Sequence, residues 1–187
     1  MLLSLRAFLK RVSARTNMEP TNNLSDVALA ALHGRITRIL PVQIRACVEE
    51  LTEDQLWWRP NEQTNSVGNL VLHVSGSMRH YLSRGVGGID YNRDRPAEFA
   101  ERGPVPKTQL LATFDETISQ AAGILTTFDT ARFLSPTEEP DYMPTLFDLI
   151  FNISIHLATH TGQVVYITKM LKEGSLDELW IKAHKGK

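Results

Sequence analysis

The chain has 187 residues, of which 42% are hydrophobic and 22% charged, as is usual for a soluble globular protein with one domain-sized core. Its net charge is −1, and because the first 17 residues hold four basic and no acidic side chains, the remainder sums to −5. A nucleic-acid interface needs clustered positive charge, so this acidic body argues against one. The single cysteine cannot form an internal disulfide, and no apolar run approaches the roughly 20 residues of a membrane-spanning helix. We expect a cytoplasmic protein that binds neither nucleic acid nor membrane.

Residues 1–21 form a basic segment that we expect to be a poorly ordered arm, followed by one domain over residues 22–187. Apolar side chains recur in this segment at helical spacing, at Leu2, Leu5, Leu9 and Val12. With basic residues opposite, this pattern also fits a targeting or membrane-surface helix, although it is too short and interrupted for a secretory signal. A translation start at Met18 is the other alternative.

A first helix is predicted over residues 24–51, with Asn23 or Ser25 as its N-terminal cap. Pro41 lies inside this span and removes one backbone donor. Because the apolar pattern resumes after the proline, we expect a kink there and not an end. Cys47 lies beside the apolar pattern and is interpreted as a small core residue in preference to a nucleophile.

The segment after the first helix opens with the sequence of a capping box, Thr52 to Gln55, and Pro60 stops any helix. Trp57 and Trp58 are adjacent, so at most one of them points straight into the core. We interpret the pair as an aromatic plug under the end of a bundle. The wall of a ligand pocket is the alternative.

A second helix is predicted over residues 67–84, and it carries a line of polar side chains on an otherwise apolar surface. The members of this line are Asn69, His73, Ser77 and His80, at spacings of four, four and three. Residues at such spacings lie on one face of a helix.

Residues 85–106 are predicted to form a loop, because glycines and prolines interrupt any helical pattern. The mixed charges around Arg93 favour a crossover whose residues pair with one another, and an arginine that holds an anionic substrate is the alternative. Long loops in compact domains often carry function. A third helix is predicted over residues 107–128.

The longest helix is predicted over residues 144–171, with Pro144 and Gly174 as typical start and stop signals. A second polar line runs along it through Asp148, Asn152, His156, His160 and Gln163. His156 and His160 stand one turn apart, which lets two imidazoles reach one metal ion. Two hydrogen-bonded histidines on a half-buried face are the alternative.

A third imidazole from the second helix, which carries His73 and His80, would complete a three-histidine site with open coordination positions. Such a site suits zinc, nickel or iron, and a catalytic zinc site keeps one position for water or substrate. Leu157 stands where metalloproteases of the HExxH type carry their glutamate base, so a peptidase of that kind is disfavoured.

A proton acceptor must then come from outside the motif, and His80 and Asp148 are the candidate catalytic residues. His80 lies two turns beyond His73, about 10 Å along the helix, so we place it in the pocket wall and not among the ligands. Asp148 has a structural alternative, since a carboxylate is favoured at a helix N-terminus. The side-chain oxygen of Gln163 is expected to accept from the second ring nitrogen of His160.

Three stretches, NLVLHVSGSMRHYLSRGVGG, RDRPAEF and HLATHTGQVVYITKML, resemble the DinB/YfiT-like superfamily of metal-binding four-helix bundles. The resemblance covers about residues 23–173 and rests mainly on His73, the run from His156 to Gln163, and Trp58 to Pro60. It implies an all-α, up-down-down-up bundle with a long crossover between helices 2 and 3, frequently dimeric. It also implies a divalent metal on His73, His156 and His160. His80 departs from the family pattern, in which an amide or aromatic residue is more usual.

Characterised members of that superfamily include thiol-dependent transferases and isomerases that use a low-molecular-weight thiol such as bacillithiol or mycothiol. The expected function is therefore a divalent-metal-dependent thiol S-transferase that acts on small molecules, with zinc or nickel as the metal. The alternatives are a metal-dependent small-molecule hydrolase and a non-catalytic, metal-bound dimeric stress or binding protein. A homodimer is expected in each case.

Overall fold

The structure is a computed structural model, and it describes residues 23–103, 105–138 and 142–174. The secondary structure of these residues is helical apart from one isolated bridge between Pro136 and Thr145. The elements are α2 (Leu24–Gly34), η1 (Arg35–Ile39), α3 (Leu40–Glu50), α4 (Glu53–Trp57), α5 (Val67–Met78), η2 (Arg79–Val86), α6 (Arg95–Ala100), α7 (Lys107–Thr126), η3 (Thr130–Arg132) and α8 (Leu146–Leu171). The predicted all-α class is confirmed. The predicted arm of residues 1–21 lies outside the described residues.

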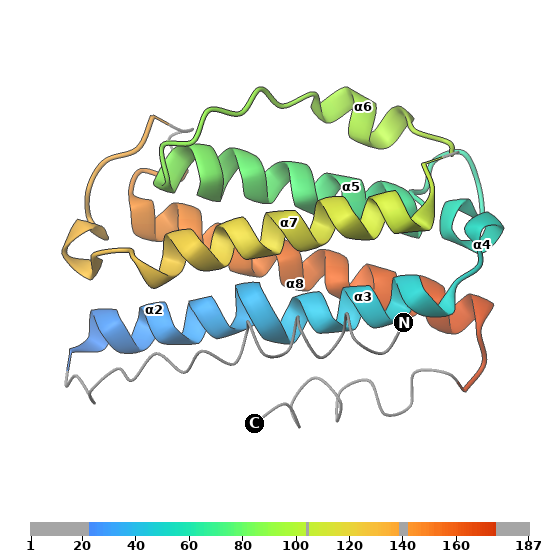
Figure 1. Cartoon of the computed structure of the whole chain (residues 1–187), viewed down its shortest axis with the longest axis horizontal. Helices are drawn as coiled ribbons and strands as arrows, with labels where there is room; N and C mark the ends of the chain where they lie inside the picture. Colours follow the sequence, from blue (N-terminus) through green and yellow to red (C-terminus); the bar gives the residue numbers. More distant parts are fainter. Residues whose placement is uncertain (1–22, 104, 139–141, 175–187) are drawn as a thin grey trace.

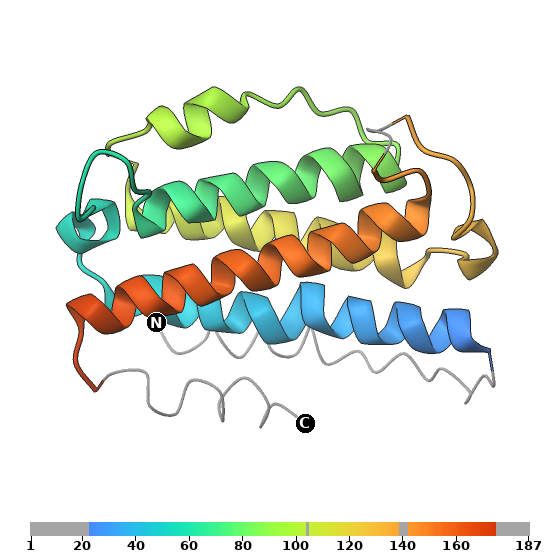
Figure 2. The same cartoon turned by 180° about the vertical axis from the view of Figure 1, so that it is seen from behind.

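The long helical segments are α2 through α3, α5 with η2, α7 and α8, and they lie side by side (Figures 1 and 2). The segment from α2 through α3 runs in the same direction as α8, whereas α5 with η2 and α7 run in the opposite direction. The chain between η2 and α7 crosses over the outside of α5 and carries the short helix α6. Within the described part of the chain, no helix combines the length and apolar character needed to span a membrane.

The first long segment passes Pro41 without ending, as predicted. Asn23 caps it, since its Oδ1 accepts from the backbone of Ser25 at 3.0 Å. The chain widens into the π-helical turns of η1 just before the proline, and Leu40 N–H donates to the Arg35 carbonyl five residues back. Pro41 has no backbone N–H to donate, and the wider turn accommodates this missing hydrogen bond without ending the helix. The apolar stripe therefore continues into α3.

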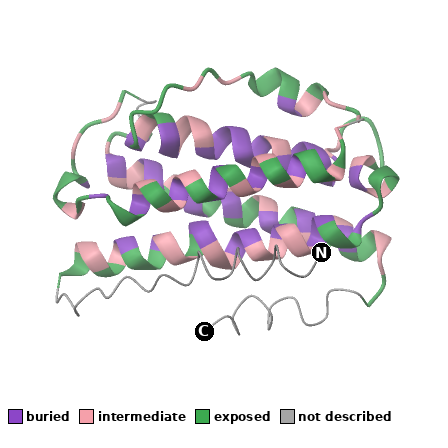
Figure 3. Cartoon of the chain, in the orientation of Figure 1, coloured by how far each residue is buried: buried purple, intermediate pink, exposed green. Residues whose placement is uncertain are grey.

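The helix α5 is buried on nearly all sides, and Leu72 is the single residue of α5 that is not buried. Helices α7 and α8 cover one side of it and α6 covers the other (Figure 3). A helix covered on every side is apolar all round or has partners for its polar groups. The polar groups of α5 therefore need hydrogen-bond partners within the fold.

The crossover over residues 87–106 differs from the predicted loop, because it contains a helix. Asp94 Oδ1 accepts from Ala97 N at 3.0 Å and caps α6, and Pro96 occupies one of the first helical positions. Proline is tolerated there because the missing N–H has no helical partner. The cap and the proline start a six-residue helix, α6, in a segment too rich in glycine for a longer one.

The fourth long helix, α8, begins at Leu146, two residues later than predicted. Its cap is Thr145, whose hydroxyl accepts from Asp148 N at 3.2 Å, and Asp148 Oδ2 accepts from Thr145 N at 3.0 Å. This reciprocal pair is a capping box and satisfies two donors that would otherwise lack partners. The cap thus fixes where the histidine-bearing helix begins.

Candidate metal centre

The three predicted ligands come together from α5 and α8. His73 Nε2 lies 3.0 Å from His156 Nε2, which lies 3.1 Å from His160 Nε2. One ligand nitrogen from each residue lies within 4.8 Å of the other two. His73 is 6% exposed, whereas His156 and His160 are half-buried. The cluster is thus closed on the side of α5 and reaches solvent on the side of α8.

Hydrogen bonds place the proton of two rings on Nδ1, away from the point where the three rings meet. His73 Nδ1 lies 2.9 Å from Glu98 Oε2, and His160 Nδ1 lies 2.7 Å from Gln163 Oε1. Carboxylate and amide oxygens accept, so each Nδ1 carries the proton and donates it. A neutral ring in this tautomer presents a lone pair at Nε2. The predicted pairing of Gln163 with His160 is confirmed.

Two Nε2 lone pairs therefore face the third ring, that of His156, which can donate one proton to at most one of them. A cation placed between the three nitrogens accepts all three lone pairs. Two nitrogens held about 2.0–2.1 Å from one ion, at right or tetrahedral angles, lie about 2.8–3.4 Å apart. The observed separations of 3.0 and 3.1 Å fit this range. The three histidines could thus hold a divalent metal ion.

The surroundings of His156 and His160 favour the neutral form of each ring, the form that metal ligation requires. Burial, together with the nearby charges of His160, His73 and Arg93, lowers the pKa of His156 to about 3. Burial also lowers the pKa of His160, against the opposing effect of its hydrogen bond to Gln163. A lowered pKa makes a ring neutral at lower pH, which keeps the lone pairs of His156 and His160 available to a cation.

Glu98 and Arg93 form a buried ion pair next to Nδ1 of His73. Glu98 is 8% exposed, and besides His73 it accepts from Arg93 Nε at 2.7 Å and from Arg93 Nη2 at 2.8 Å. Burial raises the pKa of Glu98, but the hydrogen bonds from His73 and Arg93 together outweigh it and hold the pKa below its ordinary value of 4.5. Ionised Glu98 therefore fixes the His73 tautomer, and Arg93 balances its charge. Such carboxylate–histidine pairs orient metal-binding rings.

The polar line on α5 fastens the crossover to the bundle. Asn69 Nδ2 donates to the carbonyl oxygens of Glu98 at 3.0 Å and Glu101 at 2.8 Å. One turn beyond His73, Ser77 Oγ accepts from Arg93 Nη2 at 2.8 Å. Three of the four polar residues predicted on this face thus bind the crossover, which explains how a helix buried on nearly all sides keeps them.

Gly76 makes room for this arrangement. A Cβ atom at this position would collide with the carboxylate of Glu98 and would lie 3.4 Å from Arg93 Nε. The absence of a side chain therefore lets the ion pair approach α5 closely enough to reach His73. This requirement concerns space and not backbone conformation, because Gly76 lies in the middle of a regular helix.

An aromatic ring packs against His73, and an arginine side chain packs against that ring. The Phe99 ring lies 4.6 Å from the His73 ring, centre to centre, and the Arg95 guanidinium lies 4.9 Å from the centre of the Phe99 ring. Both residues belong to α6. The crossover thus places an aromatic ring and a cationic side chain beside the histidines.

The two predicted catalytic residues lie outside the cluster of ligand nitrogens. His80 lies on η2, where its ring packs edge-on against Tyr81 at 4.8 Å. Asp148 serves the cap of α8, two turns before His156. The structure therefore brings together the three predicted metal ligands and Gln163, and it does not bring either candidate base into direct hydrogen bonding with them.

The residues that sequence reasoning missed are those of the crossover and of its seat on α5. Glu98, Arg93 and Phe99 belong to the RDRPAEF stretch, which the sequence marks only by its mixed charges and its resemblance to other proteins. Gly76 carried no signal in the sequence, since an isolated glycine in a helix has many explanations. Only the folded position of the crossover reveals their function.

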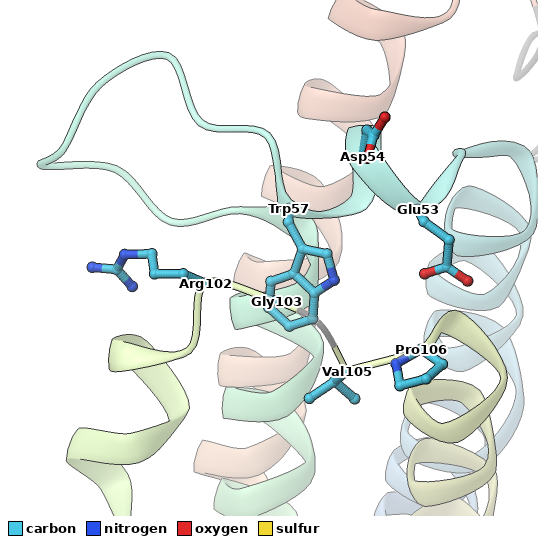
Figure 4. Close-up of a pocket in the computed structure, with 7 residues that line it drawn as sticks. All are labelled: Glu53, Asp54, Trp57, Arg102, Gly103, Val105 and Pro106. Atoms are coloured by element: carbon cyan, nitrogen blue, oxygen red, sulfur yellow. The ribbon is translucent and has the colours of Figure 1, made fainter.

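A separate hollow of about 610 Å³ lies at the end of the molecule near α4 and contains none of the three histidines. Its lining is Glu53, Asp54, Trp57, Arg102, Gly103, Val105 and Pro106 (Figure 4). Trp57 packs against Gly68 and Gly103, where an added Cβ would lie 2.7 and 3.3 Å from the indole ring. Trp57 thus joins the start of α5 to the end of the crossover, and it also lines the hollow.

No curated protein matches this chain. A family described as "Protein of unknown function (DUF1572)" matches it over residues 21–185, a span that includes all three histidines and the crossover. A match over so much of the chain shows the family. The protein is therefore a member of the DUF1572 family.

Proposed function

We propose that this protein is a metal-dependent enzyme of the DinB/YfiT-like superfamily, with zinc or nickel held by His73, His156 and His160. The convergence of one ring nitrogen from each of the three histidines carries the proposal. The directions of the four long segments and the crossover between η2 and α7 support an up-down-down-up bundle of that superfamily. Nitrogen ligands suit zinc and nickel, and the half-buried side of the cluster leaves room for a further ligand.

The reaction we propose is the transfer of a low-molecular-weight thiol to a small molecule. A divalent ion in this site would lower the pKa of a bound thiol or water. In the transfer, the thiol sulfur bonds to a substrate carbon, the bond from that carbon to its leaving group breaks, and the thiol proton passes to solvent. The leaving group departs with the bonding electrons.

The surroundings of the histidines favour thiol transfer over hydrolysis. A thiolate is itself the nucleophile, whereas an attacking water needs a positioned general base. Among the described residues, Glu98 is the one carboxylate that hydrogen-bonds to the cluster, and its oxygens already accept from His73 and Arg93. His80 remains our candidate proton carrier, and we expect His80→Gln to keep the metal and to slow turnover in a pH-dependent way.

A homodimer and a cytoplasmic location complete the proposal. Four large apolar side chains are exposed on α8: Phe151, Ile155, Tyr166 and Met170. Exposed apolar side chains along one helix support an interaction surface, which also keeps a non-catalytic binding protein as the second candidate. The buried, unpaired Cys47 is consistent with a reducing compartment.

The test is a thiol-transfer screen on metal-loaded protein prepared without a histidine tag. Several low-molecular-weight thiols are offered with small electrophiles, and the loss of thiol and formation of thioether are followed. We expect metal-dependent transfer that falls at least about 100-fold in His156→Ala, because the ligand set is broken. Equal rates in His156→Ala, or substrate cleavage that needs no thiol, would contradict thiol transfer.

A further inference from the structure

The crossover contains three arginines, and two of them are already occupied. Arg93 is held by Glu98 and Ser77, and Arg102 Nη1 donates to the carbonyl oxygens of Phe99 and Glu101. Arg95 differs from both. Within the described part of the chain, its guanidinium makes neither a hydrogen bond nor an ion pair, and it lies over the face of the Phe99 ring at 4.9 Å.

Phe99 connects this guanidinium to the metal centre. Its ring lies 4.6 Å from His73 on one side and 4.9 Å from Arg95 Cζ on the other. The sum of the two separations, about 9.5 Å, is the greatest distance that the Arg95 guanidinium can lie from the centre of the His73 ring. A small molecule whose reacting end reaches the histidines can therefore reach Arg95 with its other end.

The charges around the site favour an anion. Imidazole ligands contribute no negative charge, so the charge of a divalent ion at this site would be uncompensated, and Glu98 is already balanced by Arg93. The opposite wall, α8, carries no carboxylate between Leu149 and Leu171. Asp94, beside Arg95 in the chain, uses Oδ1 to cap α6. With a divalent ion bound, the site would thus have a local positive charge, although the protein as a whole is acidic.

We propose that this site takes a small molecule with a carboxylate or phosphate group, and that Arg95 binds this group while the reacting end lies at the three histidines. The inference rests on the proposed function and deepens it, because it names the substrate class of the same site. A guanidinium presents a planar fork that matches two anionic oxygens. Stacking on Phe99 limits the freedom that Arg95 loses when it binds.

The experiment measures binding and not turnover. Cobalt(II)-loaded protein is titrated with 3-mercaptopropionate and with 3-mercaptopropanol, which differ only in the acidic group, and the cobalt absorption bands give each midpoint. Wild-type protein should bind the acid about threefold to tenfold more tightly than the alcohol, as for one partly exposed charge-assisted contact. Arg95→Gln should abolish this preference, and Arg95→Lys should retain part of it.

Arg132→Gln is the matched control, because the Arg132 guanidinium also lies over a phenylalanine ring, Phe128, at 5.6 Å, on η3 and outside the crossover. It removes the same charge and the same type of contact, and it should leave the preference unchanged. A preference that survives in Arg95→Gln, or that falls equally in both variants, overturns the assignment to Arg95. If acid and alcohol bind equally well to wild type, the inference is wrong and the thiol chemistry stands. If neither thiol changes the spectrum, both the thiol chemistry and the inference are contradicted.

Discussion

The two ring nitrogens of His73 have different partners, and the need to hold each partner in place accounts for the residues around the ring. Nδ1 donates to Glu98, which leaves the Nε2 lone pair directed at His156. Glu98 can stay ionised in a buried position because Arg93 donates to both of its oxygens. Removing any one of these contacts should change the centre without removing a ligand.

Gly76→Ala tests this supporting role. The new methyl group would displace the Glu98 carboxylate from His73, so we expect metal affinity to fall about 10- to 100-fold, the usual effect of losing such a partner. A competition titration with a chromophoric chelator measures it. Gly123→Ala is the control, since no atom lies within 4 Å of a Cβ at that exposed helical position. Affinity that is unchanged in Gly76→Ala would mean that Glu98 does not support the site.

The burial of Cys47 leads to a prediction about the reactivity of its thiol. Its side chain is fully buried, and burial raises the pKa of its thiol from 9.0 to about 11. At pH 8 only about one thousandth of the thiol is ionised, and the thiolate is the reactive form. We expect no reaction of the native protein with a disulfide reagent at pH 8 and one equivalent of reaction after denaturation. Rapid labelling of the native protein would show that Cys47 is accessible and reactive.

At the scale of elements, the cap of α8 separates a structural role of Asp148 from a catalytic one. Asp148→Ala removes the partner of the Thr145 backbone and hydroxyl, which should destabilise the fold by about 1 kcal/mol. Urea unfolding measures this loss, and turnover at a temperature where the variant is folded should match wild type. Full stability combined with lost turnover would restore Asp148 as a catalytic residue.

The long helices could be predicted from the sequence because their signals are local. Apolar periodicity predicted helices over residues 67–84 and 107–128, where the structure has α5 continued by η2 to Val86, and α7 ending at Thr126. The spacing of His156 and His160 predicted that both would face one side. The predicted start of α8 was two residues early, because Thr145 and not the proline provides the cap. The crossover could not be placed in this way. Glu98 reaches His73 across 25 residues, and its partners depend on where the crossover lies in the fold.

At the scale of the whole molecule, we expect the apolar core to hold the fold without a metal ion. Buried apolar side chains come from all four long segments, from Ile36 on η1 to Val164 on α8, and form one cluster. A domain of this size holds its own fold without a structural ion. The protein without metal should therefore remain helical.

Metal should nevertheless raise the melting temperature by mass action. With free metal at about 100 times its dissociation constant, the gain is about 2.7 kcal/mol, or roughly 5–10 °C for a domain of this size. Calorimetry with and without chelator measures this shift, and circular dichroism should show the same helix content in both states. A metal-free protein that is largely unfolded would show that the ion is structural.

The most direct test of the three-histidine centre is the metal content of protein purified without a histidine tag, measured by elemental mass spectrometry on wild type and on His156→Ala. We predict about one divalent ion per wild-type chain after dialysis against a weak chelator, and far less than one in His156→Ala, because two imidazoles hold an ion much more weakly than three. Wild-type protein that retains no metal after loading, or His156→Ala protein that retains a full equivalent, would contradict the assignment of His73, His156 and His160 as a metal centre.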